Sequence, residues 1–159
     1  MNAEKAPGFA LRALAPADIV EVMEIERLSF DSPWTAADFE AVLSGGSHAR
    51  VAEDAGGRVA GYCVSHCVVD EAEIWTIAVR PDARGAGIGK ALLEDALSDA
   101  RSRGASRMFL EVRSGNAPAE ALYLGSGFRK IGIRRGYYRM KDGSRADAVV
   151  MERSLDDAA

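Results

Sequence analysis

One strand–helix–strand unit decides the fold of this chain. Residues 71–113 read EAEIWTIAVRPDARGAGIGKALLEDALSDARSRGASRMFLEVR. Both ends of this segment are typical of strands, and apolar side chains from Ile88 to Ala100 recur at helical spacing. Gly104 is typical of a helix end. Because two strands joined through one helix pair in parallel with a right-handed crossover, the segment predicts a parallel strand pair.

The rest of the chain adds strands on both sides of this unit. The expected elements are, in chain order, a strand at 9–14, a helix at 16–28, a short helix that Thr35 caps and that ends at Leu43, a hairpin over 48–69 that turns at Gly56 and Gly57, a helix at 116–126, a strand at 128–133 and a strand at 147–153. Because the hairpin is antiparallel, we expect an α/β fold with a mixed, mostly antiparallel sheet flanked by helices. Residues 9–155 are expected to form one domain, after a disordered N-terminus at 1–8 and before a loose tail at 156–159.

Length and composition indicate an ordinary globular domain. A chain of 159 residues buries roughly 70% of its unfolded surface on folding, enough for a core without metal or disulfide. Apolar residues make up 48% of the chain and charged residues 28%, which argues against a disordered or fibrous protein. No apolar run approaches the roughly 20 residues that span a bilayer, and the first residues lack the apolar core of a secretory signal. We therefore expect a cytoplasmic protein that binds no membrane.

The charge balance argues against direct binding of nucleic acid. The net charge is −4, from 20 basic and 24 acidic residues, whereas nucleic-acid binding depends on clustered cations. Basic residues do gather late in the chain: Arg129, Lys130, Arg134, Arg135, Arg139, Lys141 and Arg145. This run is either a solvated surface or a contact for a charged ligand.

The two cysteines predict reduced thiols. Cys63 and Cys67 lie on one face of an expected strand with their Cα atoms roughly 13 Å apart, too far for a disulfide. Reduced thiols agree with a cytosolic protein. His66 faces the other side of that strand and has no second ligand at metal spacing, so we expect a structural histidine and no metal site.

The loop from Arg84 to Lys90 carries glycine at positions 85, 87 and 89. Without Cβ atoms, successive backbone N–H groups can point inward, and the helix that begins there adds its positive end, which suits a pyrophosphate. The spacing matches neither the nucleotide P-loop nor the dinucleotide fingerprint, since Lys90 stands where the third glycine would be. A structural turn without a ligand is the alternative.

The pattern Arg-x-x-Gly-x-Gly between a strand and a helix resembles the acyl-CoA loop of the GNAT acetyltransferase superfamily. Further pieces that agree are Phe30, Pro33 and Trp34, TIAV at 76–79, LEVRSGNAPAEALYLGSGF at 110–128, IRRGYY at 133–138 and DAVVM at 147–151. Over most of its length the chain is similar to the bacterial ribosomal-protein-alanine N-acetyltransferases of that superfamily. The resemblance implies acetyl-CoA as co-substrate and, as acceptor, a protein N-terminus, namely the N-terminal alanine of a small-subunit ribosomal protein.

The resemblance also implies which residues bind acetyl-CoA. They are Ile77, Ala78 and Val79 in the strand, Arg84, Gly85, Ala86, Gly87, Ile88, Gly89 and Lys90 in the loop, and Asn116. In this family the strand at 71–79 splays from the strand at 107–113, so that its freed backbone groups bind pantetheine and one N–H polarises the thioester oxygen. Asn116 is also a good helix cap, and that role alone would explain it.

Glu111 is the one acidic residue in the apolar strand at 107–113. A carboxylate in a covered strand is costly unless it is paired or solvated. An ion pair with an arginine is one explanation. The resemblance implies the other, a general base that takes a proton from the acceptor amine. Glu73, on the neighbouring strand, is either a second candidate base or a solvated strand end.

Tyr123 follows Asn116 by seven residues, about two helical turns, so both lie on one helix face. Tyr123 is either a core residue or, by resemblance, the general acid that protonates the departing CoA thiolate. A phenol suits that role because it stays protonated at neutral pH.

The candidate acceptor site consists of Trp34, Arg135, Tyr137 and Tyr138. Two aromatic rings next to Gly136 can form a slot for the first residues of an extended peptide, which Arg134 and Arg135 would orient. The segment RRGYY at 134–138 is expected as the loop between the last two strands, either a slot for an extended peptide or an ordinary exposed hairpin. The region around Trp34 would form the facing wall.

These observations predict direct acetyl transfer in a ternary complex to the N-terminal α-amine of a protein. One rival keeps the reaction but takes a small-molecule amine or a lysine side chain as acceptor. The other is a non-catalytic acetyl-CoA-binding regulator, against which the presence of Glu111 and Tyr123 argues.

Overall fold

A seven-stranded sheet, in the order β1-β2-β3-β4-β5-β7-β6, runs through the computed structural model, which describes residues 8–156. The strands are β1 (Phe9–Ala13), β2 (His48–Asp54), β3 (Val59–Val68), β4 (Glu71–Val79), β5 (Arg107–Arg113), β6 (Arg129–Arg139) and β7 (Arg145–Ser154). Neighbouring strands pair antiparallel except β4 and β5, which pair in parallel. The predicted mixed, mostly antiparallel sheet is confirmed. The predicted loose ends at 1–8 and 156–159 lie outside the described residues, apart from Gly8 and Asp156.

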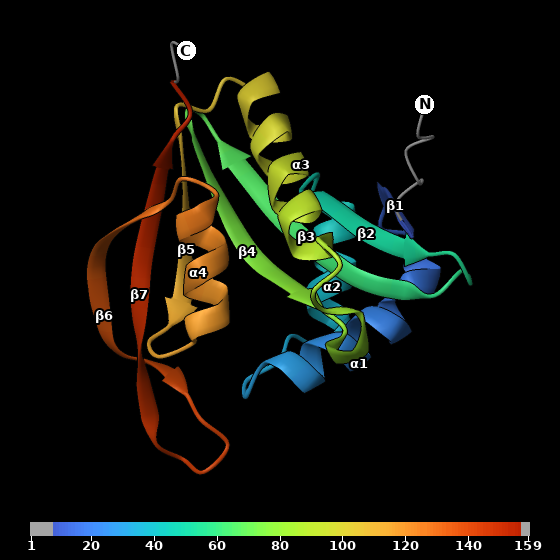
Figure 1. The fold of residues 1–159 in the computed structure, drawn as a ribbon, viewed down its shortest axis with the longest axis horizontal. Helices are drawn as coiled ribbons and strands as arrows, with labels where there is room; N and C mark the ends of the chain where they lie inside the picture. Colours follow the sequence, from blue (N-terminus) through green and yellow to red (C-terminus); the bar gives the residue numbers. More distant parts are fainter. Residues whose placement is uncertain (1–7, 157–159) are drawn as a thin grey trace, which may run out of the picture.

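Helices cover both faces of the sheet, in two pairs (Figure 1). They are α1 (Ile19–Ser29), α2 (Ala36–Ser44), α3 (Ile88–Ser102) and α4 (Ala117–Gly125), with short 3-10 turns at Pro16–Asp18 and Pro81–Ala83. The pair α1 and α2 packs on one face and the pair α3 and α4 on the other. No helix among the described residues is long and apolar enough to cross a membrane.

Two cores hold the layers together. One lies under α3, where the predicted stripe from Ile88 to Ala100 is buried against β3, β4 and β5. The other lies under α1 and α2 and includes Phe39 and Tyr62, whose rings meet edge to face at 5.8 Å. The strands β5, β7 and β6 carry α4 on one face, and Figure 1 shows no helix of the described residues over their other face.

The strands β4 and β5 part soon after they meet. Their register covers only residues 71–73 of β4 against residues 107–109 of β5, and from there the two strands diverge (Figure 1). β4 also contains an extra residue, because Val64 of β3 lies opposite Thr76 whereas the next residue lies opposite Ile74. Trp75 is therefore a bulge, and the side chains before and after it face different layers. The outer edge of β4 beyond residue 73 is left without a strand partner in β5.

The prediction that residues 134–138 form a loop is wrong, since they lie inside β6. The register of β6 against β7 jumps between Arg134 and Tyr138, so the intervening residues bulge outward. Gly136, at φ +61°, adopts the bulge conformation, and its N–H donates to the Asp147 carboxylate at 2.8 Å. The connection to β7 is instead a turn at Gly143, where φ is +86°.

Candidate active site

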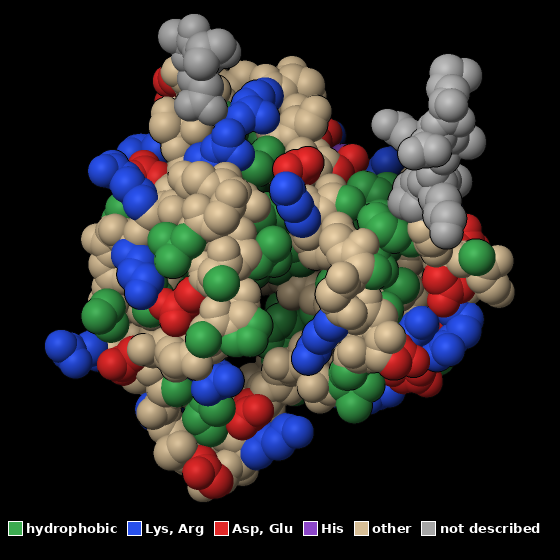
Figure 2. All heavy atoms as spheres, viewed as in Figure 1, with side chains coloured by type: hydrophobic (Ala, Val, Ile, Leu, Met, Phe, Trp, Pro, Cys, Tyr) green, Lys and Arg blue, Asp and Glu red, His purple; other side chains and the backbone are tan. Residues whose placement is uncertain are grey.

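A cavity of about 230 Å³ lies where β4 and β5 diverge. Its walls come from α1, the segment after α1, β4, β5, α4, the end of β6 and the start of the β6–β7 turn. Figure 2 shows the molecule hollowed between the part that carries α4 and the part that carries α3, with apolar side chains on the walls. The predicted site residues that line the cavity are Trp34, Ile77, Glu111, Asn116, Tyr123 and Tyr138.

Glu111 lies in β5 just beyond its last residue in register with β4. Its side chain is 15% exposed, and the Nε of Arg134 lies 3.5 Å from its Oε1. The ion pair considered from the sequence is therefore present, and the same carboxylate faces the cavity. A hydrogen bond to Glu111 raises the pKa of the Tyr137 phenol, with burial as the second cause. The carboxylate can thus take up a proton from a group in the cavity while a cation and a phenol hold it in place.

Tyr123 reaches the cavity from α4 and is buried. Burial raises the pKa of its phenol, so the hydroxyl stays protonated through neutral and mildly alkaline pH. Phe128 packs against its ring at a centroid distance of 6.1 Å. Asn116 caps α4 by accepting a hydrogen bond from the Ala119 amide at 3.4 Å, and it also lines the cavity. A proton donor and a polar amide therefore face the same space as Glu111.

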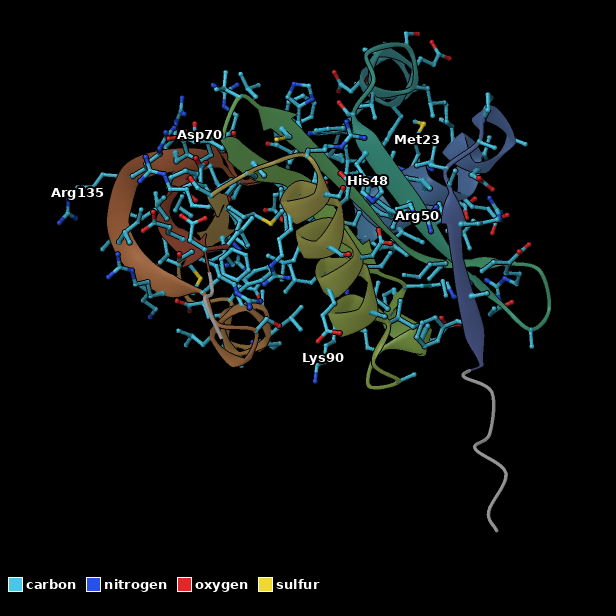
Figure 3. The ribbon with its side chains drawn as sticks, turned by 90° about the horizontal axis from the view of Figure 1, so that it is seen from above. Met23, His48, Arg50, Asp70, Lys90 and Arg135 are labelled. Atoms are coloured by element: carbon cyan, nitrogen blue, oxygen red, sulfur yellow. The ribbon has the colours of Figure 1, made fainter. Side chains whose placement is uncertain are left out.

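The glycine-rich loop is open on its outer side. Gly85 and Gly87 have φ values of +86° and +85°, and a Cβ at either position would meet nothing within 4 Å. Gly87 is the N-cap of α3 and offers no side-chain hydrogen bond, so the amides of the first turn stay available. The buried Ile88 side chain anchors the start of the helix, and Lys90 points away from the sheet (Figure 3). This geometry fits the phosphate groups of a nucleotide-like carrier.

The end of β4 links this loop to the cavity. Ile77 lines the cavity, while the Ala78 side chain is buried in the core under α1 and α2. Ala78 therefore offers only backbone groups to a ligand. The carbonyl of Val79 accepts a hydrogen bond from the Nε of Arg84 at 3.2 Å.

Some predicted residues lie apart from the cavity. Arg135 projects from β6 away from the rest of the molecule (Figure 3), with its side chain 86% exposed and its guanidinium 3.9 Å from Asp147. Tyr137 is not among the cavity residues, but it contacts Glu111 and lies 5.3 Å from the Arg134 guanidinium. Burial and the nearby Glu111 charge raise the pKa of Glu73, which lies beside the cavity rather than in its lining.

The last two turns of α1 contain two cavity residues that sequence reasoning missed. Glu26 is a buried carboxylate, and the Ser29 hydroxyl is buried with no hydrogen-bond partner among the described residues. A signal for Glu26 was present, because it stands four residues after Val22 on the apolar face of the helix. No comparable signal points to Ser29.

Two loops meet at the mouth of the cavity. The Ser32 hydroxyl donates to the Arg139 carbonyl at 2.8 Å, and the Lys141 amide donates to the Asp31 carboxylate at 3.0 Å. These bonds join the segment after α1 to the β6–β7 turn across more than a hundred residues of sequence. We call this pair of hydrogen bonds the latch.

Comparisons with known proteins find similarity to acetyltransferases in both sequence and fold. The model of the acetyltransferase (GNAT) family matches residues 19–128. The ribosomal protein bS18-alanine N-acetyltransferase of Escherichia coli K12 is 36% identical over 141 residues, which cover 89% of this chain and 94% of that protein. The N-alpha-acetyltransferase RimI of Mycobacterium tuberculosis is 37% identical over 99% of both chains. A crystal structure of the ribosomal-protein-S18-alanine N-acetyltransferase from Escherichia coli superposes with a TM-score of 0.84 at 33% identity, covering 95% of this chain and 96% of that one.

Proposed function

This chain belongs to the GNAT acetyltransferase family, and on that premise we propose that it transfers the acetyl group of acetyl-CoA to the N-terminal α-amine of a protein. The proposed acceptor is the N-terminal alanine of ribosomal protein bS18, the substrate in the name of the Escherichia coli relative. We assign catalysis to residues 9–155 and the site of action to the cytoplasm. The free thiols of Cys63 and Cys67 support that location.

One observation carries the proposal. Glu111 on β5 and Tyr123 on α4 face a single cavity at the point where β4 turns its free edge toward it. Transfer of an acyl group from a thiol to an amine needs a base for the amine proton and an acid for the departing thiolate, and both lie within this cavity. The open loop at Gly85 and Gly87 lies at the end of the same strand and supports binding of the CoA pyrophosphate.

The reaction proceeds by direct attack. An N-terminal amine has a pKa of about 8, so most of it is protonated at neutral pH and must lose a proton before attack. Glu111 accepts that proton, the amine nitrogen bonds to the thioester carbonyl carbon, and backbone N–H groups of β4 stabilise the oxyanion. The C–S bond then breaks as Tyr123 donates its proton to the departing CoA sulfur. The surplus proton on the acylated nitrogen passes to the Tyr123 phenolate, which restores the phenol and leaves a neutral amide. Glu111 releases its proton to solvent when the products leave.

The cysteines support a route without an acetylated enzyme. Burial raises the pKa of the Cys63 thiol far above neutral, so this residue holds almost no thiolate. Cys67 is absent from the cavity lining. Attack therefore takes place in a ternary complex of enzyme, acetyl-CoA and acceptor.

A peptide panel tests the acceptor. The purified chain is incubated with acetyl-CoA and a synthetic peptide copying the N-terminus of bS18, and the products are located by tandem mass spectrometry. We expect one acetyl group on the α-amine of the first alanine. The matched controls are the same peptide with a blocked α-amine and an internal lysine, and a set of small amines. Acetylation of those controls alone, or of nothing, would overturn the proposal.

A further inference from the structure

Glu26 is a buried carboxylate at the acceptor site that the mechanism above does not use. It lies on the inner face of α1, is 2% exposed and lines the cavity. The exposed Glu24, two residues earlier, is an ordinary solvated side chain of the same helix. A glutamate in a core is retained only where its oxygens are fully bonded, since burying a bare carboxylate costs several kcal/mol in real proteins.

Three hydrogen bonds from three different elements converge on this carboxylate. Its Oε1 accepts from the Tyr62 hydroxyl on β3 at 2.6 Å and from the Thr76 hydroxyl on β4 at 2.7 Å. Its Oε2 accepts from the backbone amide of Trp34 at 2.8 Å. No ion pair to Glu26 is present among residues 8–156 within 4.0 Å. Hydrogen bonds to a charged acceptor are roughly twice as strong as neutral ones, so these three fix their partners firmly.

Two of the three partners belong to different walls of the cavity. Trp34 is the last residue of the segment from Phe30 to Trp34, which lines the cavity and which we call the acceptor wall. Its ring packs on Phe39 at 5.1 Å and lies 6.4 Å from the Trp75 ring. Thr76 follows the bulge in β4 and precedes Ile77, the first predicted acetyl-CoA-binding residue of that strand.

We propose that Glu26 is a positioning residue that sets the spacing between the acceptor wall and the thioester-binding part of β4. This inference rests on the proposed function and deepens it. One carboxylate holds the wall through the Trp34 amide and the strand through Thr76, so the acceptor nitrogen is delivered at a fixed distance from the thioester carbon. Misplacement of reacting groups by about 1 Å can cost on the order of 100-fold in rate.

The latch holds the same wall from its outer side, through Asp31 and Ser32. Glu26 holds it from the inner side, where water has little access. The wall is thus fixed at both ends. Of these hydrogen bonds, only the inner one leads to β4, beside the contact between the Trp34 and Trp75 rings. Loss of Glu26 should therefore weaken acceptor binding and leave acetyl-CoA binding unchanged.

The test compares three variants by steady-state kinetics with both substrates varied. For Glu26→Ala we expect kcat/KM for the acceptor to fall by about tenfold or more, chiefly through a higher acceptor KM, with the acetyl-CoA KM within about twofold of wild type. Glu26→Gln should recover most of this loss, because its amide can bond to all three partners when the two hydroxyls rotate. Tyr62→Phe is the matched control. It removes one bond from the same carboxylate and should lower thermal stability without moving the acceptor KM.

A second readout does not depend on turnover. In a Trp75→Phe background, Trp34 is the remaining tryptophan, and its exposure is measured by acrylamide quenching. Glu26→Ala should increase the quenching constant by about twofold, whereas Tyr62→Phe should leave it unchanged. Glu26→Asp, which keeps the charge but shortens the reach, replaces the alanine variant if that variant does not fold.

The outcomes separate the two proposals. A wild-type chain that acetylates no peptide N-terminus overturns the proposed function, and the quenching result still decides whether Glu26 holds the wall. An active wild type with an unchanged acceptor KM and unchanged quenching in Glu26→Ala overturns the role of Glu26. Equal rises in both KM values would also overturn it, because the carboxylate would then support the fold as a whole.

Discussion

The two halves of the sheet are built differently. The donor half, strands β1 to β4, is covered by helices on both faces, and residues such as Val64 and Leu92 are completely buried in it. The acceptor half, strands β5, β7 and β6, carries a helix on one face only, and β6 is exposed along almost its whole length. The cavity lies between the halves, with walls from both.

The difference between the two halves matches the two unlike substrates of the proposed reaction, acetyl-CoA and a protein N-terminus. In the proposed reaction the donor half binds acetyl-CoA through backbone groups of β4 and of the loop at Gly85 and Gly87, which a packed core holds in place. In the proposed reaction the acceptor contacts charged and aromatic side chains, such as Glu111 paired with Arg134 in the acceptor half and Trp34 in the segment after α1. Binding of the carrier and proton transfer should therefore be separable by mutation.

The sharpest test removes the charge of Glu111. In Glu111→Gln we expect kcat to fall by about 100-fold or more, because the amide cannot take the proton from the amine. The acetyl-CoA Kd, measured by titration calorimetry, should stay within about twofold of wild type. Glu73→Gln is the control and should keep most of the turnover. A comparable loss of acetyl-CoA affinity in Glu111→Gln would contradict the division between the halves.

The reverse test fills the loop of the donor half. Gly87→Trp places a bulky side chain where a Cβ meets open space and the first amides of α3 are available. We expect the acetyl-CoA Kd to rise by about 100-fold. Gly104→Trp is the matched control, because Gly104 has a φ of +86°, also faces open space and lies at the other end of the same helix. Equal weakening in both variants would point to helix strain rather than to a filled cradle.

Opening the latch should have a smaller effect, confined to the acceptor. In the double variant Asp31→Ala and Ser32→Ala, both bonds to the β6–β7 turn are lost. Because these side chains are exposed, we expect an increase of about three- to tenfold in the acceptor KM with little change in Tm. Glu40→Ala, an exposed change on α2, controls for surface charge. An unchanged acceptor KM would show that the inner bond to Trp34 suffices.

The smallest expected effect concerns stability and pH. Burial and the Glu111 charge raise the folded-state pKa of Glu73, so the ionised carboxylate destabilises the fold at neutral pH. Glu73→Gln should therefore raise Tm slightly at pH 7. The gain should disappear near pH 4, where the wild-type carboxyl is largely protonated in both states. Differential scanning calorimetry at the two pH values measures this, and an equal gain at both would contradict the pKa argument.

The donor half could be predicted from the sequence because its signals are local. The stripe from Ile88 to Ala100, the glycines of the loop and the helix end at Gly104 are all read within a few residues of where they act, and the structure confirms the elements they predict. The splay between β4 and β5 came from the family resemblance, and the register confirms it.

The acceptor half was harder to predict from the sequence, because its geometry depends on residues that are distant along the chain. The bulge at Gly136 is held by Asp147, eleven residues away on another strand, so RRGYY reads as a loop when taken alone. Glu26 bonds to residues 8, 36 and 50 positions away, and none of these pairings leaves a local pattern. Arg134 and Arg135 are neighbours in sequence, yet one reaches Glu111 and the other points to solvent.

The short pairing between β4 and β5 has a consequence for how a protein of this fold can evolve. Only three residues of each strand are in register there, and beyond them each strand follows its own neighbours. Under the proposed function, substitutions in the β6–β7 hairpin can thus alter the acceptor site without straining β4, the strand proposed to bind acetyl-CoA. Related proteins can therefore change the acceptor that they acetylate while they keep the same acetyl-CoA site.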